Sequence, residues 1–210
     1  RWYASRLPSG FPGAYFDGKN GLYVDGKTRE VLVPERLLVP GAHMRRNILA
    51  AALACRLYGM PSDAIAKAAA TYKGVEHRLE VFFEHEGIHF CNASAATVPQ
   101  AVESALAAFD QDIVLITGGT DKNLDFQAVR DAYKKPKRII LLTGSGTDKL
   151  ISVLNADGIE YDGPFDILDK AIQKAVSMAQ RGTVVLFSPG CTSFGMFNNE
   201  FDRGKQFKTG

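Results

Sequence analysis

The chain has 210 residues, and its 46% hydrophobic content is ordinary for a folded globular protein, which excludes extensive disorder. Its 25 basic and 23 acidic residues are spread along the sequence and give a formal net charge of +2, so it lacks the basic stripe that nucleic-acid binding usually needs. Its longest apolar runs are far too short to cross a bilayer, and we therefore expect neither a nucleic-acid partner nor membrane insertion.

The first 74 residues predict a small antiparallel meander followed by two helices. Alternating apolar and polar residues at 21–24 and 30–33 are separated by Asp-Gly turns. Apolar residues recur at helical spacing over 47–57, and a second helix follows Ser62, which we expect to cap it. Residues 1–74 hold too few long apolar runs to close a core of their own, so we expect them to be the end of a domain.

From residue 75 onward, strands and helices alternate. The predicted strands are 79–84, 88–91, 113–116, 138–142, 159–161 and 183–187. The predicted helices include Val102 to Phe109, one that starts near Phe126, one capped by Thr147 and one capped by Asp166. This alternation predicts a mostly parallel sheet covered on both faces, so the expected fold class is α/β, with a Rossmann-like domain over residues 75–210.

One loop of this predicted sheet indicates a ligand site. The apolar run 113–116 stops at Gly118-Gly119, and Thr120, Asp121 and Lys122 follow, with Asp125 placed to cap the next helix. Such a loop lies at the carboxyl end of a buried parallel strand, where open α/β sheets bind ligands. Lys122 can meet a carboxylate or phosphate there, although a plain turn with a solvated lysine explains the same residues equally well.

Four further segments bring polar groups to strand ends or helix starts. They are residues 41–47 with Asn47, 74–78 with His77 and Arg78, 92–99 with Thr97, and 188–194 with Ser193. The free N–H groups at a helix start bind anions, and an arginine guanidinium can bind two anion oxygens at once. An asparagine amide can form hydrogen bonds with the edge of a nucleotide base. Taken singly, each segment is explained as well by a helix cap, a surface amide or a boundary salt bridge.

Several kinds of site are disfavoured. The chain has no G-x-x-x-x-G-K-[ST] loop, and residues 144–146 match only the first part of the glycine-rich dinucleotide-binding motif. The sequence therefore contains no phosphate-binding loop of its own. Three widely spaced cysteines predict neither a disulfide framework nor a zinc site, and they fit a reducing, cytoplasmic location. Cys191 is disfavoured as a nucleophile because no histidine is placed by sequence to activate it. The four histidines show no metal-ligand spacing.

Taken together and in this order, these segments resemble the carboxyl-terminal part of the Mur ligases, and within that family the members that add D-glutamate. The matching strings are G-x-H-x-x-x-N-x-x-A-A from Gly41, His77-Arg78-x-Glu80, N-x-S-x-A-T from Asn92, Gly118-Gly119-Thr120-Asp121-Lys122, Ser188-Pro189-x-Cys191-x-Ser193-Phe194 and Arg203-Gly204-x-x-Phe207. Each string is weak alone, but their joint order and spacing carry the resemblance over residues 41–207.

The resemblance implies that residues 1–74 end the family's central ATPase domain and that 75–210 form its Rossmann-like, amino-acid-binding domain. The implied reaction is ATP-dependent amide formation in peptidoglycan precursor synthesis. ATP phosphorylates the carboxylate of UDP-MurNAc-L-alanine, and the amine of D-glutamate attacks the acyl phosphate, with Mg²⁺ offsetting charge on the phosphoryl group. The Mg²⁺ ligands and the P-loop are expected outside this chain, which starts on Arg1 and would be an inactive, monomeric fragment.

The resemblance also assigns residues. Lys122, Thr97 and Ser193 correspond to ligands of the D-glutamate carboxylates, Asn47 to an adenine contact, and His77 and Arg78 to nucleotide contacts; no catalytic residue is assigned. Ala93, Ala95 and Val98 depart from the family pattern, since they stand where an acid, a lysine and an asparagine are usual, and Met44, Gly195 and the order Glu200-Phe201 also differ. We expect the missing acid at Ala93 to weaken nucleotide binding.

Two alternatives stay open. A sister ligase of the same superfamily would add another amino acid, but the string from Gly118 to Lys122 favours D-glutamate. A non-catalytic, Rossmann-like ligand-binding module is the second alternative, and Ala93 and Ala95 would permit such a loss of turnover.

Overall fold

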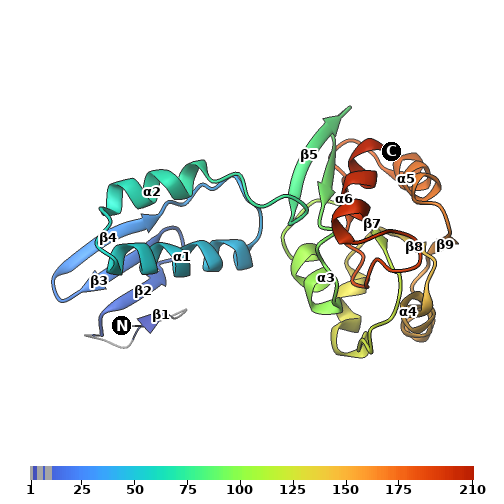
Figure 1. Ribbon diagram of the computed structural model, residues 1–210, viewed down its shortest axis with the longest axis horizontal. Helices are drawn as coiled ribbons and strands as arrows, with labels where there is room; N and C mark the ends of the chain where they lie inside the picture. The colour runs from blue at the N-terminus through green and yellow to red at the C-terminus, as the bar shows by residue number, and fades with distance from the viewer. Residues whose placement is uncertain (1, 4–6, 8–10) are drawn as a thin grey trace. The chain divides into compact units, whose positions relative to one another are not determined.

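The computed structural model describes residues 2–3, 7 and 11–210. It divides the chain into two compact units, Arg1–Gly74 and Val75–Gly210, which are described separately (Figure 1). None of the helices in the described residues is long and apolar enough to cross a membrane.

The first unit contains a four-stranded sheet in the order β1-β2-β3-β4. Its strands are β1 (Trp2–Tyr3), β2 (Gly13–Phe16), β3 (Gly21–Asp25) and β4 (Thr28–Val33). Strands β2 to β4 pair in antiparallel fashion, as the predicted meander requires, whereas β1 pairs in parallel with β2. The predicted antiparallel meander is confirmed for β2 to β4, and β1 is an additional strand that the sequence did not predict.

Two helices, α1 (Ala42–Leu57) and α2 (Ser62–Thr71), complete the first unit and bury Leu49, Leu53 and Ile65 against the sheet. Helix α1 starts five residues before the predicted start because Gly41, at φ 90°, lets the chain turn into the helix there. Ser62 does not cap α2. Its hydroxyl donates to the carboxylate of Glu30 on β4, and Pro61 is the N-cap residue.

The second unit contains a six-stranded sheet in the order β5-β6-β10-β7-β8-β9. Its strands are β5 (Glu80–His85), β6 (Ile88–Asn92), β7 (Ile113–Thr117), β8 (Arg138–Leu142), β9 (Asp162–Phe165) and β10 (Val184–Phe187). Only the hairpin of β5 and β6 is antiparallel, and the other neighbouring pairs are parallel. The predicted α/β class with a mostly parallel sheet is confirmed.

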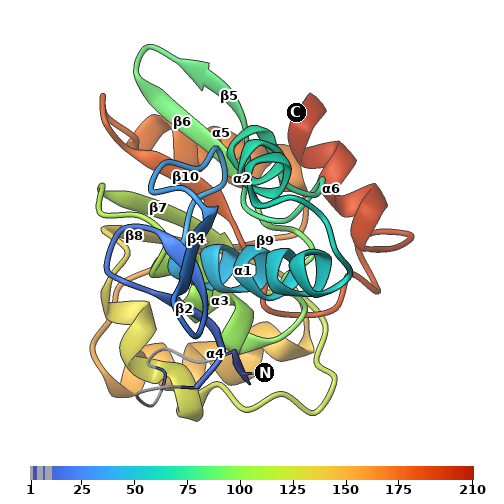
Figure 2. The same ribbon diagram turned by 90° about the vertical axis from the view of Figure 1, so that its left-hand side faces the viewer.

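Helices cover both faces of this sheet. They are α3 (Pro99–Leu106), the 3-10 helix η1 (Gln127–Lys134), α4 (Ser145–Ala156), α5 (Leu168–Met178) and α6 (Glu200–Thr209). In Figures 1 and 2, α3 and α4 lie on one side of the sheet and α5 on the other. Alternate strand residues face the α5 side, where Ile116 and Phe187 form a core with Ile172 of α5 and Phe207 of α6.

Several local predictions are wrong. The edge strand β9 occupies residues 162–165 instead of 159–161, since an unpaired edge tolerates Pro164. Thr97, Thr147 and Asp166 do not cap their helices, whose N-cap residues are Val98, Gly144 and Ile167. The predicted helix near Phe126 is a 3-10 helix, and the carboxylate of Asp125 accepts bonds from its first amides, as expected of a cap.

Candidate functional site

Three neighbouring strands of the second unit carry the predicted amino-acid site. β10 lies between β6 and β7, and Phe187 at its end is level with Asn92 on one side and Ile116 on the other. β6, β7, β8 and β9 follow one another in one direction across the sheet, and the chain then turns back and inserts β10 between β6 and β7. The strand order therefore reverses at β10. Open α/β sheets bind ligands at the carboxyl ends of strands beside such a reversal.

The loops that leave these three strands are hydrogen-bonded to one another. We call residues 92–99, 118–122 and 188–194 the carboxyl-end loops. The Gly118 amide donates to the Pro189 carbonyl, and the Gly190 amide donates to the Ala96 carbonyl, both at 2.9 Å. Loop 188–194 is therefore hydrogen-bonded to both of the other loops. We call the three connected carboxyl-end loops the rim.

Thr97, Lys122 and Ser193 each lie on one of the carboxyl-end loops. Thr97 is half-buried, Lys122 is exposed and Ser193 is buried. Within the described part of the chain, none of the three side chains takes part in a hydrogen bond or ion pair with another residue. Two hydroxyls and an ammonium group that the protein itself does not satisfy suit an anionic ligand such as a carboxylate.

The three residues predicted to contact a nucleotide lie in different settings. Asn47 is exposed on α1 of the first unit, and Arg78 is exposed just before β5 of the second. Neither side chain has a bonding partner among the residues that the structure describes. His77 differs, since only 2% of its surface is exposed. The amide of Asn47 and the guanidinium of Arg78 are thus available to a ligand, whereas the imidazole of His77 is turned inward.

Asn92, at the end of β6, holds the His77 ring. Its amide nitrogen donates to His77 Nδ1 at 3.1 Å and to the Gly204 carbonyl at 2.9 Å, while its oxygen accepts from the Ser94 amide at 3.0 Å. A Cβ atom on Gly204 would lie 2.4 Å from both His77 Nδ1 and Ser94 Oγ, so a glycine is required there. His77 therefore joins β5, β6 and α6 in the interior.

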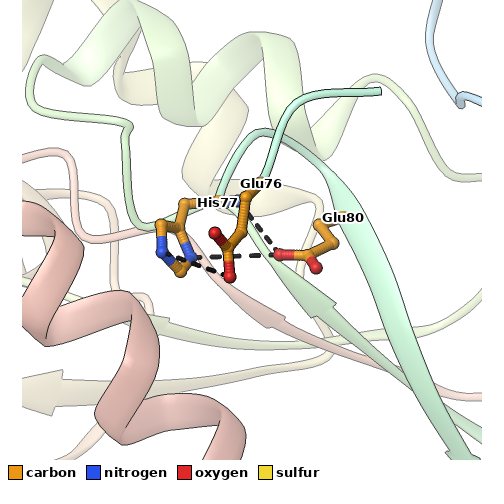
Figure 3. A group of neighbouring side chains, drawn as sticks. All are labelled: Glu76, His77 and Glu80. Carbon is orange, nitrogen blue, oxygen red and sulfur yellow. Dashed lines mark hydrogen bonds and ion pairs between the residues drawn. The ribbon is translucent and has the colours of Figure 1, made fainter. Parts of the chain in front are cut away.

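Glu76 and Glu80 lie beside this imidazole and form with it a group of potential metal ligands (Figure 3). Glu76 faces His77 Nε2 and Glu80 faces Nδ1, each at 3.9 Å. Lys208 of α6 pairs with Glu76 at 3.2 Å and with Glu80 at 2.7 Å. The hydrogen bond from Lys208, together with His77, lowers the pKa of the Glu76 carboxyl. An internal ammonium group thus already offsets the charge of both carboxylates, and we assign no metal there.

Arg203 of α6 belongs to one of the matching strings, but the sequence assigned it no role, and the structure places it against the carboxyl-end loops. It is 1% exposed, and its guanidinium donates to the Cys191 carbonyl at 3.0 Å and to the Ser94 carbonyl at 2.7 Å. No carboxylate of the described residues pairs with it, and burial lowers its pKa to about 10. It remains a cation at neutral pH, and its two hydrogen bonds connect loop 188–194 to loop 92–99.

Cys191 is a residue of loop 188–194 and is fully buried. Burial raises the pKa of its thiol to about 12, so the sulfur is protonated at neutral pH. A thiol in this state is a poor nucleophile, which agrees with the absence of an activating histidine.

Residues 77–191 match the protein-family model described as "Mur ligase, glutamate ligase domain". Among curated proteins, the chain is 38% identical to the UDP-N-acetylmuramoylalanine–D-glutamate ligase of a Roseiflexus species, covering 99% of the chain and 46% of that protein. It is 34% identical to the ligase of the same name from Treponema pallidum, covering 89% of the chain and 43% of that protein. The chain therefore spans about half the length of these relatives.

Solved structures share the fold. A UDP-N-acetylmuramate-alanine ligase from Thermotoga maritima aligns with a TM-score of 0.62 at 20% identity, covering 90% of this chain and 42% of that one. FolC of E. coli, in complex with ADP, aligns with a TM-score of 0.65 at 17% identity, covering 93% of this chain and 45% of that one. At these identities the likeness concerns the fold alone.

Proposed function

The chain belongs to the Mur ligase family, and from that premise we propose that it is the carboxyl-terminal part of a ligase that adds D-glutamate to UDP-MurNAc-L-alanine. The observation that carries the proposal is the convergence of Thr97, Lys122 and Ser193 on hydrogen-bonded loops of three adjacent strands. Their unsatisfied groups suit the carboxylates of an amino acid. The names of the relatives at 34% and 38% identity favour D-glutamate over another amino acid.

The proposed reaction forms an amide at the expense of ATP. The precursor carboxylate attacks the γ-phosphorus of ATP, giving an acyl phosphate and ADP. The deprotonated amine of D-glutamate then attacks the acyl carbon, and the tetrahedral intermediate expels inorganic phosphate. Lys122 holds a carboxylate of D-glutamate by a charge-assisted contact while the Thr97 and Ser193 hydroxyls donate to carboxylate oxygens, so that the amine is held in a fixed orientation.

The remaining substrates engage other parts of the protein. We propose that Asn47, His77 and Arg78 contact the nucleotide; Asn47 and Arg78 are exposed, whereas His77 is buried and Asn92 holds its ring. We further propose that residues 1–74 end the central ATPase domain and that residues 75–210 bind the amino acid. Magnesium, when bound, neutralises charge on the transferring phosphoryl group, and its ligands and the P-loop are proposed to lie outside these 210 residues. The 210-residue chain is then inactive alone, and the whole enzyme acts in the cytoplasm.

Phosphate release tests this function. The complete reading frame that contains this sequence is expressed, and inorganic phosphate is measured with ATP, UDP-MurNAc-L-alanine and D-glutamate together and with each omitted. Release that requires all three supports the proposal. Release that requires a different amino acid would establish a sister ligase instead, and no turnover with any amino acid would favour a ligand-binding module.

A further inference from the structure

The loop that carries Lys122 is held by the amino end of helix α4. The Gly119 carbonyl accepts from the Gly146 amide at 2.9 Å and from the Thr147 amide at 3.3 Å. These amides belong to the first turn of the helix, where backbone N–H groups lack the usual helical partner; the Thr147 amide also donates to the carbonyl of the N-cap residue Gly144 at 2.9 Å. The loop therefore occupies the position that an external anion would take at an open helix start.

The side chain of Thr147 also contacts the loop that carries Lys122. It is fully buried, and its hydroxyl donates to the Leu142 carbonyl at 2.6 Å while accepting from the Gly119 amide at 2.9 Å. A Cβ atom on Gly118 would lie 2.5 Å from this hydroxyl, so loop and side chain are in direct contact. The hydroxyl thus links the end of β8 to the loop after β7.

Asp121 fixes the residue directly before Lys122. Its amide donates to Ser145 Oγ at 3.0 Å, and its carboxylate pairs with Lys149 at 2.5 Å and accepts from the Leu124 amide at 2.9 Å. The bond from the Leu124 amide and the pairing with Lys149 lower the pKa of Asp121, so it stays charged at neutral pH. The backbone of Lys122 is held on both sides, while its own side chain extends into solvent.

We propose that Thr147 is a positioning residue for the amino-acid substrate. Together with Ser145 and Lys149 of the same helix, it fixes residues 119–121 and thereby sets where Lys122 presents its ammonium group. Helix α4 contributes no group that touches substrate and acts through Lys122. The inference rests on the proposed function, since it assumes that Lys122 meets a carboxylate of D-glutamate.

The test compares three variants in the complete protein. Thr147→Val keeps the shape but leaves the Gly119 amide without an acceptor, and Thr147→Ser restores the hydroxyl. Thr183→Val is the matched control, because Thr183 is also buried and accepts from a backbone amide, that of Gln180 at 3.0 Å, but lies just before the amino end of β10. For each variant, the KM of every substrate, kcat, the melting temperature and amide hydrogen exchange at Gly119 and Asp121 are measured.

We expect Thr147→Val to raise the KM for D-glutamate about tenfold, as loss of one buried hydrogen bond would, and to speed exchange at Gly119 and Asp121. The KM for ATP should stay within about twofold of the wild-type value. Thr147→Ser should restore both the KM for D-glutamate and the slow amide exchange, whereas Thr183→Val should lower only the melting temperature. Equal changes in every KM, or an effect of Thr183→Val like that of Thr147→Val, would overturn the positioning role. If phosphate release by the wild-type protein does not require D-glutamate, the proposed function is wrong. Unchanged amide exchange in Thr147→Val would separately refute the contact between Thr147 and the loop at residues 119–121.

Discussion

Thr120 and Thr192 form an antiparallel bridge between two loops that lie 72 residues apart in the chain. The Thr120 amide donates to the Thr192 carbonyl at 3.3 Å, and the Thr192 amide returns a bond to the Thr120 carbonyl at 3.1 Å. The Thr192 hydroxyl adds a third bond, also at 3.1 Å. Lys122 and Ser193 follow these threonines closely, so the bridge sets the spacing of two of the three proposed D-glutamate ligands.

Lys122→Ala should raise the KM for D-glutamate and lower kcat. A charge-assisted hydrogen bond contributes about 1.5 to 3 kcal/mol, so kcat/KM should fall by roughly one to two orders of magnitude. Steady-state phosphate release checks this. Lys137→Ala is the control, because Lys137 pairs with Asp112 at 2.8 Å near the amino ends of β7 and β8 and should be kinetically silent. Unchanged kinetics in Lys122→Ala would remove the lysine from the site.

Gly119→Ala should destabilise the second unit strongly. Gly119 has φ +144°, and an added Cβ would lie 2.8 Å from the Thr192 carbonyl oxygen. Backbone strain and this overlap together should lower the free energy of unfolding by about 2 to 4 kcal/mol in urea titrations. Gly182→Ala is the matched control, since Gly182 has φ +89° but open space around it, and should cost about 1 kcal/mol. Similar losses in the two variants would mean that the loops do not pack as closely as described.

Acid should weaken the first unit through Glu30. Hydrogen bonds from Arg56 and Ser62 lower the Glu30 pKa from 4.5 to about 2. Because the folded-state pKa is the lower one, this stabilisation is present above pH 4.5 and is lost as the pH falls toward 2. After allowance for solvent screening, it contributes about 1 to 2 kcal/mol. Urea titrations at pH 7 and pH 2.5 measure how much the free energy of unfolding falls in acid. This fall should be larger for wild type than for Glu30→Gln, and equal falls in the two proteins would contradict the prediction.

Ala93→Asp should tighten ATP binding, because it restores the acid that the resemblance implies at this position and whose absence we expect to weaken nucleotide binding. Ala93 is only 4% exposed, so the new carboxylate is partly desolvated and the melting temperature should fall by a few degrees. Calorimetric titration with ATP measures the affinity of the complete protein. Ala93→Asn has the same size without the charge and should bind ATP less tightly than Ala93→Asp. Equal or weaker affinity in Ala93→Asp than in wild type would reject the assignment.

The sequence predicted the sheet and the site loops because both depend on local patterns. Apolar runs such as 113–116 identify buried strands, and the parallel class places their carboxyl ends at one edge. The resemblance to the Mur ligases was still needed to group Thr97, Lys122 and Ser193, because the polar strand ends alone left a helix cap or a plain turn as equal explanations. That β10 lies between β6 and β7 was not encoded in any one segment.

The remaining features depend on contacts between distant segments. Thr147 has the residue type of a cap, but its hydroxyl bonds to Leu142 and Gly119 because the loop after β7 occupies the helix start. Arg203 looks like a surface arginine of a polar helix, and only the packing of α6 against the rim buries it. Gly144 and Gly146 suggested part of a nucleotide fingerprint, yet they allow Gly119 to approach closely.

Whether this protein selects D-glutamate is decided by the mass of the product. The complete protein is incubated with ATP, UDP-MurNAc-L-alanine and an equimolar mixture of D-glutamate, L-glutamate, L-alanine and diaminopimelate, with isotopic labels that distinguish the two glutamates. We expect the precursor to gain one glutamyl residue, from the D isomer. A product carrying any other of these amino acids, or an unmodified precursor, would contradict it.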